Sequence, residues 1–151
     1  MTTALIADDE APLRDFLRRQ LATAWPELEI VAEAAHGGEA LEAIDARRPD
    51  VAFLDIRMPL LTGLEVAQRA THACRVVFVT AHDEYAVQAF EAAALDYLLK
   101  PVNAQRLART VERIKAALDQ PAPDLHEILA GLSNQLLARP EYLQWLQVSQ
   151  R

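Results

Sequence analysis

The sequence predicts an α/β fold: a doubly wound, five-stranded parallel sheet with helices on its two faces. Short apolar runs alternate along the chain with segments of helical periodicity, and this alternation is typical of βα units. The runs at 51–54 and 76–79 are apolar throughout, as in strands that helices cover on both faces.

The expected strands are short apolar runs bounded by polar or turn-forming residues. Pro26 closes the first βα unit, and a loop through Pro59 and Gly63 follows the third strand. From the N-terminus, the strands are expected at 4–7, 28–34, 51–54, 76–79 and 97–99.

The expected helices carry apolar residues three and four positions apart. Pro12 suits the first turn of the first helix, and Gly37 opens the second. The third is expected at about 64–70, the fourth from 82 or 83 to about 93, and the fifth from 103 to about 118. Their apolar faces are Leu13, Phe16, Leu17 and Leu21 in the first, Ala40, Leu41 and Ile44 in the second, Tyr85, Ala86, Ala89 and Phe90 in the fourth, and Leu107, Val111, Ile114 and Leu118 in the fifth.

The alternation stops at residues 120–123, where Pro121 and Pro123 interrupt the last helix. Asp124, with Glu127 three residues later, has the spacing of a capping box and predicts a further helix up to Arg139. We therefore expect one domain at 1–119, and at 120–151 a linker helix followed by the start of an output domain that this sequence does not include.

Composition excludes several classes of protein. With 52% hydrophobic and 25% charged residues, the chain can bury a full core. The formal net charge of −7 opposes attraction to nucleic acid phosphates, so DNA binding would need the missing domain. Cys74 is the only cysteine, which rules out an intrachain disulfide and a cysteine-based metal site. No apolar run approaches the roughly 18 residues of a membrane span, and no signal peptide is recognised, so a cytoplasmic location is expected.

Polar residues stand at the ends of four expected strands: Asp8, Asp9, Asp55, Thr80 and Lys100. The carboxyl ends of parallel strands line the crevice where such sheets bind ligands, so these side chains should converge. Carboxylates held so close raise one another's pKa, and a bound cation relieves that repulsion. Oxygen ligands favour Mg²⁺. A free carboxylate beside a lysine and a hydroxyl suits phosphoryl transfer to aspartate.

These residues and their spacing resemble the receiver domain of two-component response regulators, over residues 3 to about 118. The resemblance implies a flavodoxin-like sheet of strand order 2-1-3-4-5. The motifs that carry it are Asp8-Asp9, Leu54-Asp55-Ile56-Arg57-Met58-Pro59 with Gly63, Val79-Thr80-Ala81, and Asp96-Tyr97-Leu98-Leu99-Lys100-Pro101.

The resemblance implies that Asp55 is the phospho-acceptor. It also implies that Mg²⁺ is bound by the carboxylates of Asp8, Asp9 and Asp55, partly through water at Asp8, and by the backbone carbonyl of Arg57. Lys100 would pair with Asp55 before the reaction and with a phosphoryl oxygen after it. For Asp55 the alternative is a cap after a buried strand, and for Lys100 a solvated cation at a strand end.

Further residues are implied to read and modulate the phosphoryl group. Thr80 would donate a hydrogen bond to it, Tyr97 would turn inward as Thr80 moves, and Ala81 would leave room for the donor. His82 lies where the family modulates the access of water to the phosphoryl group. The peptide bond between Lys100 and Pro101 is cis in the family. The alternatives are an ordinary strand residue for Thr80, an aromatic covering the last helix for Tyr97, and a surface residue for His82.

The function implied is a receiver that accepts a phosphoryl group from a sensor histidine kinase and switches a C-terminal transcriptional output domain, with a homodimer possible on phosphorylation. It would be no enzyme beyond catalysing its own phosphorylation and dephosphorylation. The stretches 80–90 and 96–102 look most like regulators with a LytTR-type output domain. The alternatives are an aspartyl-phosphate phosphatase of the haloacid-dehalogenase kind, whose second acid is replaced here by Arg57, and a receiver-like module without phosphate turnover.

Overall fold

The computed structural model describes residues 1–82, 84, 88 and 94–119. The fourth helix expected from the sequence lies almost entirely outside these residues. The linker helix and the strand-like stretch after it lie wholly outside them.

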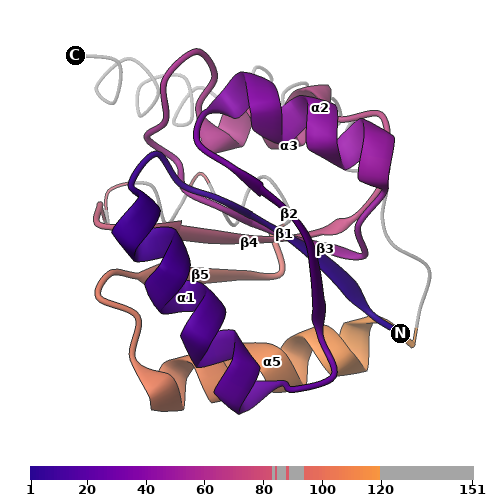
Figure 1. Ribbon diagram of the computed structural model, residues 1–151, viewed down its shortest axis with the longest axis vertical. Coiled ribbons are helices and arrows are strands. Elements are labelled where there is room, and N and C mark those ends of the chain that lie inside the picture. Colours follow the sequence, from indigo (N-terminus) through magenta and orange to yellow (C-terminus); the bar gives the residue numbers. More distant parts are fainter. Residues whose placement is uncertain (83, 85–87, 89–93, 120–151) are drawn as a thin grey trace, which may run out of the picture.

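A five-stranded sheet forms the centre of the structure (Figure 1), with all neighbouring strands parallel and in the order β2-β1-β3-β4-β5. The predicted fold class and strand order are therefore confirmed. The strands are β1 (Thr3–Ala7), β2 (Glu29–Ala34), β3 (Val51–Leu54), β4 (Arg75–Thr80) and β5 (Asp96–Leu99).

Helices cover both faces of this sheet, as the fully apolar strands predict. Figure 1 shows α2 and α3 above the sheet and α1 and α5 below it. The bounds are α1 (Ala11–Ala24), α2 (Gly37–Arg47), α3 (Gly63–Arg69) and α5 (Ala104–Ala117). Among the described residues, no helix is long and apolar enough to cross a membrane.

Two hydrophobic clusters fill the spaces between the sheet and these helix layers. Successive residues of a strand point to opposite faces, so Phe53 packs toward α1 and α5 while Leu54 packs toward α2 and α3. Cys74 is buried in the same cluster as Leu54, and burial raises the pKa of its thiol to about 12.

Side-chain caps fix where the helices start, and hence where the loops at the sheet edge end. Asn103 accepts a hydrogen bond from the Arg106 amide at the start of α5. Thr62 and Glu65 form a reciprocal capping box at the start of α3. His36 accepts a bond from the Glu39 amide at the start of α2.

One side chain differs from expectation, and for a second, Tyr97, the alternative weighed above is not observed. Phe16 was predicted on the buried face of the first helix, yet it is 39% exposed, because the face of α1 that reaches the core is narrower and centres on Leu17 and Leu21. Tyr97 does not cover the last helix. It points to the opposite face of β5 and packs against the cluster beneath α2 and α3, while its neighbour Leu98 packs toward α5.

Candidate functional site

The strand ends that carry the predicted polar residues meet at one edge of the sheet. Ala7 is in register with Leu54, and Thr80 with Leu99, so the residues that follow β1, β3 and β5 emerge at the same edge of the sheet. Backbone hydrogen bonds continue past the strands, from the Asp55 amide to the Ala7 carbonyl at 2.9 Å and from the Lys100 amide to the Thr80 carbonyl at 2.8 Å.

Lys100 joins two of the carboxylates. Its Nζ lies 2.9 Å from Asp55 Oδ2 and 2.5 Å from Asp8 Oδ2. The three side chains are only 12%, 8% and 7% exposed in the order Lys100, Asp55, Asp8, so the ion pairs lie in a partly desolvated setting. The pair with Asp55 was expected from the sequence, whereas the pair with Asp8 was not.

Burial and neighbouring charges shift the pKa values of both Asp55 and Lys100. Burial raises the pKa of the Asp55 carboxyl, and the Asp8 charge raises it further, while the hydrogen bond and charge of Lys100 act in the opposite direction. Burial alone would lower the pKa of Lys100, but its hydrogen bonds and charge interactions with Asp8 and Asp55 raise it. Asp55 is therefore more basic than an exposed aspartate, and Lys100 is firmly cationic.

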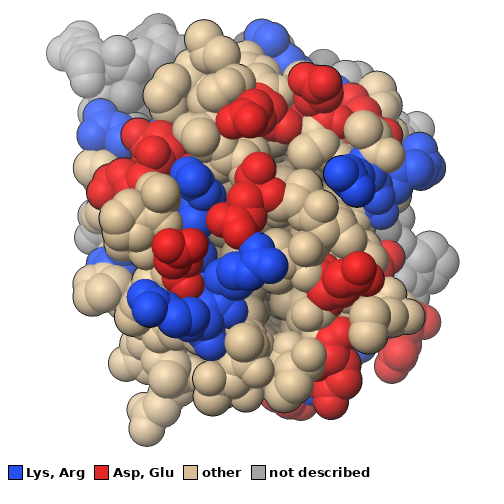
Figure 2. Space-filling model, in the orientation of Figure 1, with Lys and Arg blue, Asp and Glu red and all other residues tan. Residues whose placement is uncertain are grey.

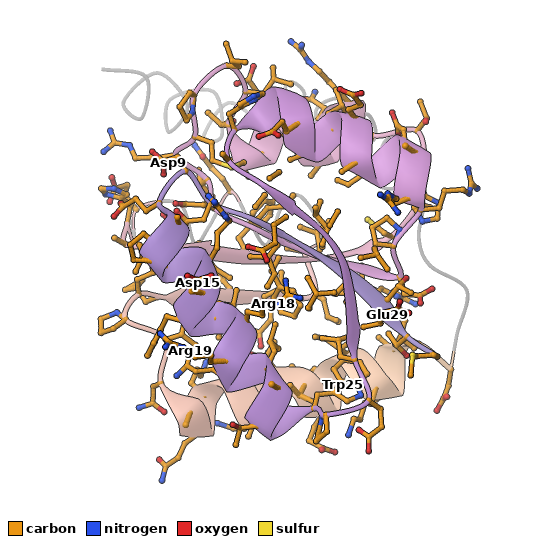
Figure 3. All side chains as sticks on the ribbon, viewed as in Figure 1. Asp9, Asp15, Arg18, Arg19, Trp25 and Glu29 are labelled. Atoms are coloured by element: carbon orange, nitrogen blue, oxygen red, sulfur yellow. The ribbon has the colours of Figure 1, made fainter. Side chains whose placement is uncertain are left out.

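Three acidic side chains lie together between the ion pair of Lys100 with Asp8 and the solvent. One ligand oxygen each from Asp8, Asp9 and Glu10 lies within 4.8 Å of the others, and Asp9 and Glu10 are exposed. Figure 3 shows Asp9 in the loop between β1 and α1. Carboxylate oxygens with open positions for water are the donors that Mg²⁺ prefers, so the residues present fit this ion. Glu10 was not predicted, although its adjacency to Asp8 and Asp9 was a visible signal.

The loop that holds Asp8 is fastened to α1. Arg14 Nη1 donates to the Asp8 carbonyl at 2.6 Å, and its Nε lies 3.4 Å from Glu33 Oε1 of β2. Arg18, one turn further along α1, also pairs with Glu33. Figure 2 shows the result on this face, where basic and acidic side chains alternate over α1 and β2. Arg14 was missed by sequence reasoning because its partner on β2 is distant along the chain.

Thr80 closes the floor of the site. It is fully buried, and within the described part of the chain its Oγ1 has no hydrogen-bond partner of good geometry. It is still close enough to Asp55 to lower the pKa of that carboxyl. A buried hydroxyl without a partner of good geometry is rare, so this one can still turn toward a new acceptor. Ala81, the next residue, is exposed.

His82 and Arg57 form part of the rim. Arg57 Nη1 lies 3.3 Å from His82 Nε2, and the Arg57 amide donates to Asp55 Oδ1 at 3.3 Å. His82 Nδ1 is 3.7 Å from Glu84 Oε1, and the Tyr97 hydroxyl donates to the His82 carbonyl. His82 is thus more than an isolated surface residue, since it links Arg57, two residues after the predicted acceptor, to Tyr97.

A network that the sequence did not reveal ties the start of β5 to α5. Asp96 is buried and accepts hydrogen bonds from the Arg106 guanidinium, the Thr110 hydroxyl and the Tyr97 amide. The Lys100–Pro101 peptide bond that follows β5 is cis, as implied for this motif. Arg106 and Thr110 lie four residues apart on α5, and this spacing was the available signal for the network.

Gly63 matches the motif glycine for a steric reason. A Cβ on this residue would lie 2.3 Å from the Asp55 carbonyl oxygen, so only glycine allows α3 to start this close to the end of β3.

The comparisons with known proteins agree with this geometry. The model of the response regulator receiver domain matches residues 4–112. The chain belongs to the response regulator receiver domain family. It is therefore a receiver domain of a two-component system, and the phosphatase alternative is not favoured.

Relatives and solved structures share this assignment. The chain is 47% identical, over 97% of its length and 59% of the relative's, to an uncharacterized response regulatory protein of Vibrio cholerae. It is 46% identical to the transcriptional regulatory protein BtsR of Salmonella typhi, over 76% of this chain and 48% of that protein.

Among solved structures, the response regulatory domain of mrkE from Klebsiella pneumoniae aligns with a TM-score of 0.73 and 32% identity, covering 80% of this chain and all of that domain. The receiver domain of AraT from Geobacillus stearothermophilus aligns with a TM-score of 0.71 and 39% identity, covering 79% of this chain and 96% of that domain. The curated relatives are longer, and the chain spans only about half of their length.

Proposed function

We propose that this receiver accepts a phosphoryl group from a sensor histidine kinase on Asp55, in the presence of Mg²⁺, and thereby switches a C-terminal output domain. The observation that carries the proposal is the cluster of Asp55, Asp8 and Lys100, with Nζ–Oδ2 distances of 2.9 and 2.5 Å. Next to it lies the buried hydroxyl of Thr80, which has no hydrogen-bond partner of good geometry in the described part of the chain. Together these supply a nucleophile, a cation and a hydrogen-bond donor at one point.

The metal site would be formed by the carboxylates of Asp8, Asp9 and Asp55 and the backbone carbonyl of Arg57. Asp8 and Asp9 belong to the acidic group described above, and Lys100 joins Asp55 to this group through Asp8. Glu10, the third member of the group, is a further candidate ligand. When bound, Mg²⁺ would offset the carboxylate charges and the charge on the transferring phosphoryl group.

In the transfer step, an Asp55 carboxylate oxygen attacks the phosphorus of the kinase's phosphohistidine. A P–O bond to Asp55 forms as the P–N bond breaks, and the released imidazole takes up a proton. The raised pKa of Asp55 makes its oxygen a better nucleophile than that of an exposed aspartate, and Lys100 holds it in place. In dephosphorylation, water attacks the phosphorus and the P–O bond to Asp55 breaks, so the chain acts only on its own phosphoryl group.

The switch would begin at Lys100 and Thr80. After transfer, the Lys100 ammonium pairs with a phosphoryl oxygen, and the Thr80 hydroxyl donates a hydrogen bond to another. Movement of Thr80 changes the backbone at Ala81 and His82, and the His82 carbonyl is the acceptor of the Tyr97 hydroxyl. Tyr97 would then leave that acceptor and turn inward, so phosphorylation biases a two-state element.

The output that this switch controls would lie beyond residue 119. We propose that residues 1–119 are the receiver and that 120–151 begin with a linker helix to a DNA-binding domain of LytTR type. The support is the motif resemblance at 80–90 and 96–102, the greater length of the relatives, and the name of BtsR as a transcriptional regulatory protein. Homodimerisation on phosphorylation belongs to the same proposal.

Phosphorylation of the purified chain by acetyl phosphate with Mg²⁺ tests the proposal. Intact-mass measurement should show one phosphoryl adduct on the parent chain and none on Asp55→Asn. Asp15→Asn is a matched control, because Asp15 is exposed on α1 (Figure 3). Equal labelling of Asp55→Asn and the parent would refute the assignment of the acceptor.

A further inference from the structure

Leu60 combines a strained backbone with an exposed apolar side chain. Its φ is 73°, in the left-handed region that bulky residues rarely adopt. The Leu61 amide donates to the Pro59 carbonyl at 2.9 Å, which encloses Leu60 in a three-residue turn. A turn of this kind with positive φ at its centre is the rare and strained form of the γ-turn.

No contact in the described structure shows that leucine at this position stabilises the fold. The residue is 77% exposed, so burial of its side chain does not offset the backbone strain. Its Cδ1 lies 3.4 Å from the place where a Cβ on Gly38 would be, so the side chain passes over the start of α2 without being enclosed there. Glycine or asparagine would adopt the same backbone with less strain. Strain that surrounding structure enforces is found mainly at functional sites.

The surrounding structure does enforce it. The Gly37 amide donates to the Pro59 carbonyl at 3.0 Å, and the Gly63 amide donates to the Ile56 carbonyl at 2.8 Å, so the loop of residues 57–62 is fixed at both its middle and its base. A Cβ on Gly37 would lie only 2.1 Å from the Leu61 carbonyl oxygen, which shows how closely α2 meets this loop. Leu60 is therefore presented in one conformation, and a partner would not have to order it on binding.

The base of this loop lies just beyond the end of β3, two residues after Asp55. The Asp55 side chain is only 8% exposed, so a protein that delivers a phosphoryl group to it has to seat its own surface on the rim at this edge. The loop that begins at Arg57 is part of that rim, and Leu60 is its most exposed large apolar residue. A small phosphodonor needs no such contact.

We propose that Leu60 is a docking residue for the protein phosphodonor: its side chain inserts into an apolar recess on the phosphohistidine-bearing partner and sets the rate of transfer from that partner. The inference rests on the proposed function, because it assumes a protein donor to Asp55. It adds a recognition residue that the shared site motifs do not include.

The test compares a protein donor with a small one. The protein probe is an autophosphorylated histidine kinase, chosen from a purified panel because it labels the parent chain fastest, and the small probe is acetyl phosphate. Leu60→Asn removes the apolar side chain and suits the backbone, whereas Leu60→Met keeps an apolar side chain of similar volume. We expect the second-order rate of transfer from the kinase to fall about tenfold or more in Leu60→Asn and to stay near the parent value in Leu60→Met. Labelling by acetyl phosphate should be unchanged in both, and Leu60→Asn should unfold at the parent temperature or above it.

Several outcomes would overturn the inference. Transfer from the kinase to Leu60→Asn at the parent rate would remove the docking role. Equal loss of labelling from both donors would show that Leu60 acts on the geometry of the site instead. Loss of self-association with transfer intact would identify a second copy of the chain as the occupant. A parent chain that neither donor labels would refute the proposed function itself, which separates that failure from this one.

Discussion

Replacing Asp96 with Asn should destabilise the receiver without enlarging or emptying its core. The Asp96 side chain is 1% exposed, and its carboxylate accepts two bonds from Arg106, at 2.9 Å to Oδ2 and 2.6 Å to Oδ1. Thr110 Oγ1 donates to Oδ2 at 2.7 Å, and the Tyr97 amide donates to Oδ1 at 2.8 Å. Asparagine has the same shape but only one oxygen, so its amide group would face donors with which it cannot bond.

The size of the stability loss depends on how exposed the partners of Asp96 are. Removing one partner of a fully buried ion pair costs about 3–5 kcal/mol. The Arg106 side chain is 33% exposed, so water can restore part of its hydration once the charge on residue 96 is gone. We therefore expect a loss of about 2–3 kcal/mol in the free energy of unfolding near neutral pH, which lowers the melting temperature by roughly 6–12 °C.

The loss should depend on pH in a defined direction. Burial alone would raise the pKa of Asp96, but hydrogen bonds from Arg106, Thr110 and the Tyr97 amide outweigh it and hold the pKa below the ordinary 3.8. A depressed folded-state pKa contributes stability that is fully present above the unfolded-state value and is lost as pH falls through the folded-state value. The difference between parent and variant should thus be constant well above pH 3.8 and shrink below it.

Urea unfolding of the parent, Asp96→Asn and the exposed control Asp15→Asn measures this difference directly. The control should change the free energy of unfolding by about 0.5 kcal/mol at most. A variant as stable as the control near neutral pH would refute the reasoning. A difference that persists undiminished in acid would refute the electrostatic explanation while leaving the loss of stability itself.

Three further predictions concern the loop, the metal and the domain boundary. Gly63→Ala should lower the free energy of unfolding by about 1–3 kcal/mol, because its Cβ meets Asp55 backbone, whereas Gly38→Ala, with its nearest contacts at 3.3 Å on the His36 side chain, should change it little in thermal unfolding. Asp9→Ala should weaken Mg²⁺ binding in calorimetric titration, and an affinity equal to that of Asp15→Ala would contradict the site. A chain ending at residue 119 should keep its melting temperature and its phosphorylation, and a failure to fold would place the domain boundary further along.

The sequence by itself determined the order and kind of the strands and helices in the part of the chain that the structure describes. Apolar periodicity and helix caps act over a few residues, so strands such as Val51–Leu54 and the start of α5 after Asn103 could be located to within a residue or two. The strand ends then identified the polar residues that share one edge, because parallel strands all point the same way.

Only the tertiary structure decided the partners of these residues. Lys100 and Asp8 are 92 positions apart, and nothing local to either indicates that they pair rather than Lys100 with Asp55 alone. Phe16 illustrates the same limit, because periodicity places it on the apolar stripe of α1 but the width of the stripe that reaches the core depends on how closely α5 packs beside it. Leu60 is a further example of this limit, because its positive φ comes from the hydrogen bonds that fix the loop to α2 and to the end of β3. Local sequence sets local geometry, whereas contacts between distant segments are set by how whole elements pack, and that packing minimises the free energy of the entire chain.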